Sequence, residues 1–169
     1  MRSKIVLDAD AIIHFAKGGC LSILPDILKL YDFVVLSTVY KEISEPLKTQ
    51  LDNQVNLLKI VSIVPFDPSG ELAKEFALLT KTLGRGESAC MVYCRYNHDV
   101  IGSSNLKDSR AYCEKYQLTY LTTIDFLYYA VKNRLLKVQE ANQFVIDVRN
   151  NDSTLPLVDF STFVSQVEI

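Results

Sequence analysis

The sequence predicts an α/β protein with a mainly parallel sheet of about five strands, covered by helices on both faces. Short apolar runs rich in β-branched residues alternate along the chain with longer segments whose apolar residues recur at helical spacing. Strands that alternate with helices in this way favour a parallel sheet. The length of 169 residues, with 49% hydrophobic and 22% charged residues, suits one globular domain and excludes intrinsic disorder.

Five segments are expected to form the strands. Each is short, and most are runs of apolar residues of the kind that a buried strand contains. In chain order they cover residues 4–9, 33–36, 60–64, 100–102 and 118–121. A strand buried on both faces reads as such a run rather than as an alternation of apolar and polar residues, which again favours a parallel sheet.

Helices are expected where apolar residues share one face of a helical turn. Their markers are Leu51, Val55 and Leu58; Leu72, Phe76, Leu79 and Leu83; Ala89, Val92, Tyr93 and Tyr96; Phe126, Leu127, Ala130 and Val131; and Ala141, Phe144, Val145 and Val148. The polar run at 150–153 predicts a break. We therefore expect the main domain over residues 1–150, with residues 151–169 as a C-terminal appendage of the same domain.

Charge and cysteine content narrow the functional classes. Eighteen basic and twenty acidic residues give a net charge of −2, which excludes a protein that coats nucleic acid through its bulk charge but leaves a local basic rim open. No segment reads as an export signal or a membrane span. The four cysteines include no C-x-x-C pair and predict buried free thiols in a reducing cytoplasm, with a metal site at Cys90 and Cys94 as the alternative.

Acidic side chains follow the predicted strands at their carboxyl ends. Asp8 ends the first strand, Glu42 lies on a helix after the second, Asp108 follows the fourth and Asp125 follows the fifth. In open parallel sheets the ligand crevice lies beyond these ends. Converging carboxylates with few histidines suit hard cations such as Mg²⁺ or Mn²⁺, which activate water in phosphodiester cleavage.

The acids also have structural interpretations. Asp8 is the hardest to explain in this way, because a carboxylate on an apolar strand is unfavourable without a cation or hydrogen bonds. Glu42 fits a solvated helix surface, and Glu87 fits the first turn of a helix, where any acid gains from the helix dipole. Asp108 and Asp125 each fit the third helical position of a capping box. His14 and His98 are given no chemical role.

Four segments resemble the motifs of the PIN-domain family, the nucleases that include the VapC-type toxins. In order they read IVLDADAII from residue 5, STVYKE from residue 37, LGRGESA from residue 83 and LTTIDFLYYA from residue 121. Each motif alone is weakly specific, whereas four in the family's order over about residues 4–136 are more specific. The resemblance implies a three-layer α/β/α sandwich.

The resemblance also implies a metal centre. Asp8 and Glu87 would be its central ligands, Glu42 and either Asp108 or Asn105 would complete the acidic ring, and Asp125 is a further candidate ligand. Asp8, Glu42, Glu87 and Asp108 are the expected catalytic residues. One departure concerns the segment after the fourth strand, where many members of the family have a Thr/Ser-Asp-Asp run and this chain has Ser-Ser-Asn.

The activity that the resemblance implies is metal-dependent cleavage of single-stranded or looped RNA by an activated water, with Mg²⁺ or Mn²⁺ as the cofactor. The basic residues Lys17, Arg85, Lys107 and Arg110 flank the motifs, where they either grip phosphates or are solvated charges. A toxin role, an antitoxin partner and a homodimer are expectations by analogy with the VapC-type members.

Two alternatives remain open at the level of the sequence. The Ser-Ser-Asn departure favours a catalytically degenerate PIN-like module that binds RNA or protein. The pair Asp8 and Asp10 at a strand end resembles the start of haloacid dehalogenase-like phosphatases, in which the first Asp is a nucleophile and the second an acid. That interpretation lacks the paired downstream acids and leaves the segment around Glu87 without a role.

Overall fold

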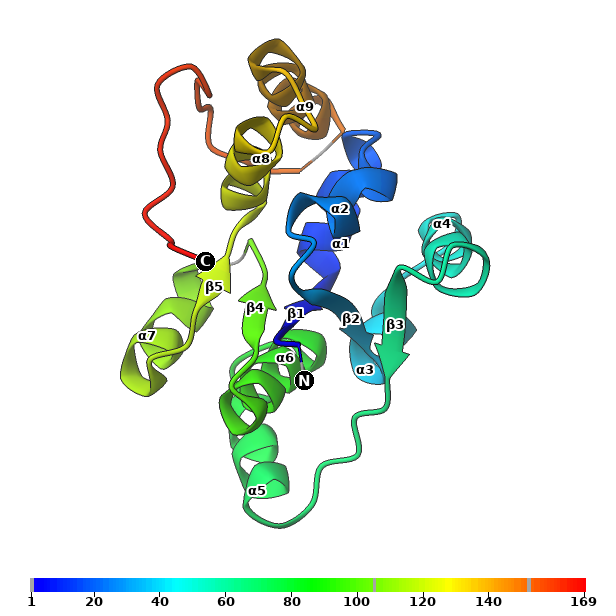
Figure 1. The fold of residues 1–169 in the computed structure, drawn as a ribbon. Coiled ribbons are helices and arrows are strands. Elements are labelled where there is room, and N and C mark those ends of the chain that lie inside the picture. Colours follow the sequence, from blue (N-terminus) through cyan, green and yellow to red (C-terminus); the bar gives the residue numbers. More distant parts are fainter. Residues whose placement is uncertain (1, 105, 152) are drawn as a thin grey trace.

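Five parallel strands form one sheet in the computed structural model, which describes residues 2–104, 106–151 and 153–169, with the side chains of 106–108 excluded (Figure 1). Their order across the sheet is β3-β2-β1-β4-β5. The strands are β1 (Lys4–Leu7), β2 (Asp32–Leu36), β3 (Val61–Val64), β4 (Val100–Gly102) and β5 (Tyr120–Leu121). The central strand β1 pairs with β2 and β4, so the residue after β1 lies beside the residues after β4.

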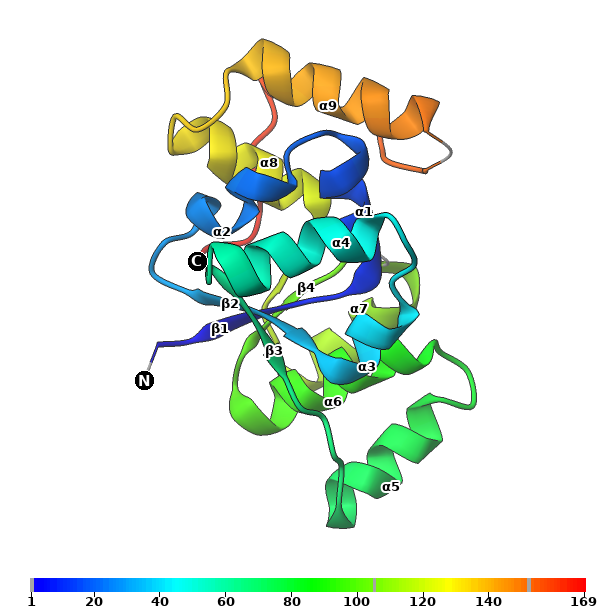
Figure 2. The same ribbon diagram turned by 90° about the vertical axis from the view of Figure 1, so that its right-hand side faces the viewer.

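Helices cover both faces of the sheet and make a three-layer sandwich (Figure 2). One layer contains α1 (Ala9–Lys17), α2 (Leu24–Ile27), α4 (Leu47–Asp52), α8 (Thr123–Lys132) and α9 (Val138–Asn150). The other contains α3 (Ser37–Glu42), α5 (Gly70–Leu79), α6 (Arg85–Asn97) and α7 (Leu106–Tyr116). A 3₁₀ turn, η1 (Leu21–Ile23), precedes α2, and a π-helical turn, η2 (Asn53–Leu57), follows α4.

The core lies on both sides of the central strands. Ile5, Val6 and Leu7 of β1 are at most 1% exposed, as expected for a parallel strand that is covered by helices on both faces. Phe144 of α9 packs against Phe15 of α1 at a ring-centroid distance of 5.1 Å, which connects these two helices of the same layer. The predicted α/β class and the parallel five-stranded sheet are confirmed.

The strand boundaries differ from the prediction by one or two residues: β2 begins at Asp32, β3 at Val61 and β5 at Tyr120. The first strand ends at Leu7 rather than at residue 9, because Asp8 is already the N-cap of α1. The shared helical face of Leu51, Val55 and Leu58 is wrong in part: Leu51 is buried, whereas Leu58 is 51% exposed. The π-helical turn over Asn53–Leu57 closes hydrogen bonds across five residues instead of four, so it rotates Leu58 away from the face that Leu51 occupies.

The segment that follows α9 packs against the helices. Leu155 and Phe160 are buried in the same core as the helices, and the Tyr129 hydroxyl of α8 donates to the backbone oxygen of Val167 at 2.5 Å. The four cysteines are free thiols, as predicted; Cys90, Cys94 and Cys113 are buried, whereas Cys20 is only partly buried, which differs from the prediction. Among the described residues, no helix has the length and apolar character that crossing a membrane requires.

Candidate functional site

Asp8 lies where the chain turns from the central strand into the first helix. Its backbone N–H donates to the Gly102 oxygen at 2.8 Å, which continues the pairing of β1 with β4, and its Oδ1 accepts the N–H of Ala9 at 2.8 Å. Only 7% of the residue is exposed. The strand-to-helix turn therefore holds a carboxylate at the carboxyl edge of the sheet with little water around it.

The electrostatic environment of Asp8 disfavours its ionised form. Burial raises the pKa of Asp8, and the negative charges of Asp10, Glu87 and Glu42 raise it further, to about 7. The hydrogen bond from the N–H of Ala9 acts in the opposite direction and does not offset the burial. The negative charges of three other carboxylates thus add to the effect of burial on the pKa of Asp8.

Asp10 lies near Asp8; it is part of the first PIN-like motif, but the sequence predicts a chemical role for it only in the phosphatase alternative. It lies in the first turn of α1, where its Oδ1 accepts the N–H of Ala11 at 2.6 Å and its Oδ2 accepts the N–H of Ser104 at 2.9 Å. The Ser103 hydroxyl lies 3.4 Å from both Asp10 oxygens and from Asp8 Oδ2. The Asp-x-Asp spacing at the end of the first strand is the signal that could have identified it.

The start of α6 carries Glu87 and contacts the Glu42 side chain through Gly86. The Glu42 side chain at the end of α3 remains largely exposed, and its Oε1 accepts the N–H of Gly86 at 2.9 Å, one of the unpaired donors of the first turn of α6. A Cβ atom at Gly86 would lie 2.4 Å from Glu42 Oε2, so the close approach requires glycine there. Glu87 follows directly and is 9% exposed. Glu42 is therefore exposed, as a solvated helix surface predicts, but it also forms a hydrogen bond to another helix.

Hydroxyl groups and a histidine join the ends of β4 and β5. The Ser104 and Thr123 hydroxyls are 2.5 Å apart, and the Thr123 N–H donates to Ser104 Oγ at 3.0 Å. His14 of α1 completes the group with its Nδ1 2.9 Å from Thr123 Oγ1. Burial lowers the pKa of His14, which is 7% exposed, so the neutral ring is favoured. This network fixes the position of the Ser104 backbone, whose N–H reaches Asp10.

Asp125 has the structural role that its sequence position allowed. It forms a capping box with Thr122 at the start of α8, in which Oδ2 accepts the Thr122 N–H at 2.9 Å. Its Oδ1 accepts the Ser165 hydroxyl at 2.6 Å. No hydrogen bond among the described residues joins Asp125 to Asp8 or Asp10. The other two predicted ligands after β4, the Asn105 residue and the Asp108 side chain, lie outside the described residues.

The chemistry of these side chains fits a hard divalent cation. Asp8, Asp10, Glu42 and Glu87 offer carboxylate oxygens, the donors that Mg²⁺ and Mn²⁺ prefer, and their mutual repulsion is relieved by positive charge. Within the described part of the chain, no three His, Cys, Asp or Glu side chains form a group that could hold a metal ion. Cation binding would thus require movement of these side chains or ligands from outside the described residues.

The basic residues that flank the motifs differ in their contacts. Lys17 donates to Ser153 Oγ at 2.7 Å, and Arg110 forms an exposed ion pair with Glu114 at 2.8 Å. The Arg85 guanidinium lies 5.4 Å from the centre of the Phe76 ring, on the first turn of α6 beside Glu87. Of these three, Arg85 is therefore the best placed to contact a phosphate at the acidic edge. The side chain of Lys107 lies outside the described residues.

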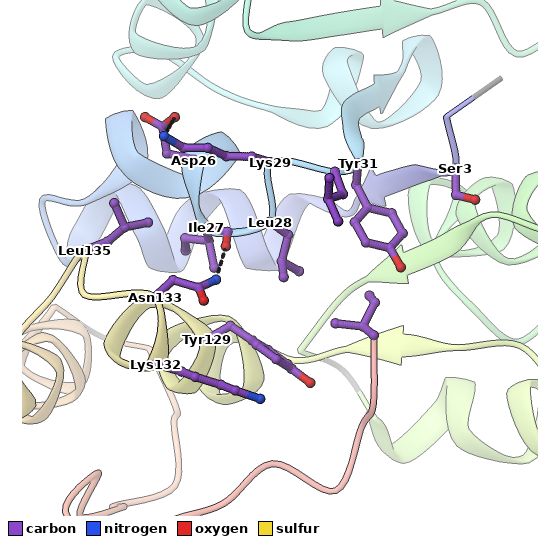
Figure 3. A pocket seen from close by; sticks show the side chains of 12 residues that line it. Ser3, Asp26, Ile27, Leu28, Lys29, Tyr31, Tyr129, Lys132, Asn133 and Leu135 are labelled. Atoms are coloured by element: carbon purple, nitrogen blue, oxygen red, sulfur yellow. Dashed lines mark hydrogen bonds and ion pairs between the residues drawn. The ribbon is translucent and has the colours of Figure 1, made fainter.

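A cavity lies at the opposite end of the sheet. It has a volume of about 690 Å³ and is lined by Ser3 and Tyr31, which precede β1 and β2, and by Tyr129 and Lys132 of α8 (Figure 3). The acids lie instead beyond the carboxyl ends of the strands. The cavity is thus separate from the acidic site.

A family model described as a PIN domain matches residues 4–156, which is most of the chain. None of the curated proteins matches the sequence. The family match favours the nuclease interpretation over the phosphatase alternative.

Proposed function

The chain belongs to the PIN-domain family, whose members are generally nucleases, and from this premise we propose that it is a metal-dependent endoribonuclease that cleaves single-stranded RNA. The observation that best supports the proposal is the environment of Asp8. This carboxylate is buried at the carboxyl edge of a parallel sheet beside three other acids, an arrangement that is unfavourable to stability unless positive charge is present.

Asp8, Glu42 and Glu87 would hold the cation, with Asn105 or Asp108 as the remaining ligand of the predicted set. When bound, Mg²⁺ or Mn²⁺ lowers the pKa of a water molecule and stabilises the leaving oxygen of a phosphodiester. Glu42 holds the first turn of α6 in place through the Gly86 N–H, and this turn carries Glu87, whose negative charge raises the pKa of Asp8. Arg85 at the same helix start would offset the repulsion between the acids and the RNA phosphates.

Single-stranded RNA is the proposed substrate class because a splayed strand can bring one phosphate close to a partly buried carboxylate, whereas a duplex holds its phosphates on a rigid cylinder. The toxin role, the antitoxin partner, the homodimer and the cytoplasmic location rest on the likeness to VapC-type members and on cysteine usage. Co-purification of the chain with the product of a neighbouring gene, and its mass in solution, would test the partner and the dimer.

The proposal predicts that the purified chain cuts an end-labelled, unstructured RNA in the presence of Mn²⁺. We expect Asp8→Asn and Glu87→Gln to abolish the cleavage, because each removes a carboxylate from the site. Asp26→Asn is the matched control: Asp26 is an exposed acid at the other end of the sheet that pairs with Lys29 at 3.5 Å, and the variant should cut as the wild type does. Cleavage that survives both site substitutions would contradict the proposal.

A catalytically degenerate module is the second candidate. It is favoured by the serines at the end of β4 and by the lack of a ready three-ligand group among the residues whose side chains the structure describes. A module of this kind predicts RNA binding without cleavage and without Mn²⁺ dependence. RNA binding by wild type and Asp8→Asn, measured with and without Mn²⁺ by fluorescence anisotropy, distinguishes the two candidates.

A further inference from the structure

The carboxylate of Asp10 connects the first turn of α1 with the end of β4. Its Oδ2 accepts the backbone N–H of Ser104 at 2.9 Å, and the Ser103 hydroxyl lies 3.4 Å from each of its two oxygens. β4 itself is followed by two serines. The negative charge next to these serines is therefore supplied by a side chain of another element.

Asp10 and Asp8 face the same hydroxyl group. Ser103 Oγ is 3.4 Å from Asp8 Oδ2 as well as from Asp10, so the two carboxylates converge on one point at the junction of β1 and β4. Asp10 is partly exposed, whereas Asp8 is buried, so Asp10 lies on the solvent side of the pair.

A role in the helix alone does not account for this arrangement. An acid in the first turn of α1 gains from the helix dipole, and Asp10 Oδ1 accepts the Ala11 N–H at 2.6 Å. That role uses one oxygen. The other oxygen accepts a hydrogen bond from the end of a strand that is 94 residues away in the sequence, and the His14–Thr123–Ser104 network holds that strand end in place.

We propose that Asp10 is a further ligand of the divalent cation at Asp8, and that it supplies at the end of β4 the carboxylate that Ser103 and Ser104 do not. The inference rests on the proposed function, because it requires that this edge of the sheet binds a cation. It assigns to Asp10 a role beyond the four acids of the predicted catalytic set.

An exchange of two residues tests the proposal. Because Ser103 Oγ already points at the Asp10 oxygens, a carboxylate carried by residue 103 would enter the same space. The double variant Asp10→Ser with Ser103→Asp keeps the composition and the net charge of the chain. Mn²⁺ binding is measured by isothermal titration calorimetry on the full chain for wild type, Asp8→Asn, Asp10→Asn, Asp10→Ser, the double variant and the control Asp26→Asn.

We expect Asp10→Asn and Asp10→Ser to weaken Mn²⁺ binding about tenfold or more, as loss of a carboxylate close to a metal does, while Asp26→Asn binds as the wild type does. The double variant should recover most of the lost affinity. The melting temperature of each variant without Mn²⁺ separates weaker binding from loss of structure. If the double variant does not fold, Asp10→Asn decides, because it keeps the shape of the side chain.

Two results would overturn the proposal and distinguish its failure from that of the proposed function. If Asp8→Asn loses Mn²⁺ binding and Asp10→Asn keeps it, Asp10 has only a structural role in the first turn of α1, and the proposed nuclease site stands without it. If the wild type does not bind Mn²⁺, the proposed function fails and the inference fails with it. Weaker binding by Asp10→Ser that the exchange does not restore would contradict the assignment to the end of β4.

Discussion

At the scale of single residues, Asp8 lowers the stability of the ion-free protein whenever it is ionised. Its pKa is raised from 3.8 to about 7 by burial and by Asp10, Glu87 and Glu42, so the folded state holds the proton more tightly than the unfolded state does. As the pH rises from about 4 to about 7, the unfolded state therefore loses its proton first, and the free energy of unfolding falls.

Asp8→Asn should remove this loss, because asparagine is an equally good N-cap and carries no charge. Without metal, we expect the variant to exceed the wild type in free energy of unfolding by up to about 4 kcal/mol above pH 8, and to match it near pH 4. Urea unfolding of wild type and variant, near pH 4 and above pH 8, measures the difference in free energy of unfolding. A variant that is less stable than the wild type at high pH would contradict the electrostatic account of Asp8.

The sequence identified Asp8 because a carboxylate interrupts an apolar strand, a pattern with few structural explanations. Asp125 could not be assigned from sequence alone, since a capping box and a ligand both place an acid three residues after a threonine. The hydrogen bond of Asp10 could not be predicted, because its partner, the Ser104 N–H, comes from a distant part of the chain. Local spacing places Asp10 two residues after Asp8 but does not show what its side chain contacts.

At the scale of elements, the start of α6 depends on the absence of a side chain at residue 86. Gly86→Ala would place a methyl group 2.4 Å from Glu42 Oε2, and the Glu42 side chain can move away because it is exposed. We expect a small change in melting temperature and a marked loss of Mn²⁺ affinity and RNA cleavage, because both Glu42 and the first turn that carries Glu87 lose their position.

Gly84→Ala is the matched control for that substitution. Gly84 lies two residues earlier and a Cβ atom there would have no heavy atom within 4 Å of it. The control should keep both the metal affinity and the cleavage rate of the wild type. Equal effects of the two substitutions would show that the helix start is sensitive to any side chain, and the contact between Glu42 and Gly86 would then not explain the result.

The packing of α1 against α9 depends on a second glycine. A Cβ atom at Gly18, the C-cap of α1, would lie 2.2 Å from the Phe144 ring of α9. We expect Gly18→Ala to lower the free energy of unfolding by about 1–3 kcal/mol, as overpacking of a core does, with Mn²⁺ affinity unchanged in the folded protein. Addition of Phe144→Leu should restore part of the stability; no recovery would contradict the steric explanation.

The sequence patterns predicted the helices more accurately than the turns that connect them. The apolar face of α9 was predicted correctly because Ala141, Phe144 and Val145 recur at regular helical spacing and are all buried. The same reasoning misplaced Leu58, because a π-helical turn changes the number of residues per turn. The π-helical turn contacts β3, and the local periodicity of apolar residues does not reveal such a turn.

At the scale of the whole molecule, the alternation of strands and helices was enough to predict the class and the parallel sheet. The order β3-β2-β1-β4-β5 was not predictable, since it depends on contacts between segments far apart in the sequence. The consequence for function is that β1 and β4 become neighbours. That pairing brings Asp8 and Asp10 to Ser103 and Ser104, and it makes one site from two distant segments.

The most direct test of the central claim is the position of Mn²⁺ in crystals of the wild-type chain, located by anomalous scattering. The account predicts a single strong peak at the carboxyl edge of the sheet, within ligand distance of the Asp8 and Asp10 carboxylates, and no peak there in Asp8→Asn crystals treated identically. A saturating Mn²⁺ soak that leaves this edge without a peak, or that places the ion elsewhere, would contradict the claim that these acids form a metal-dependent nuclease centre.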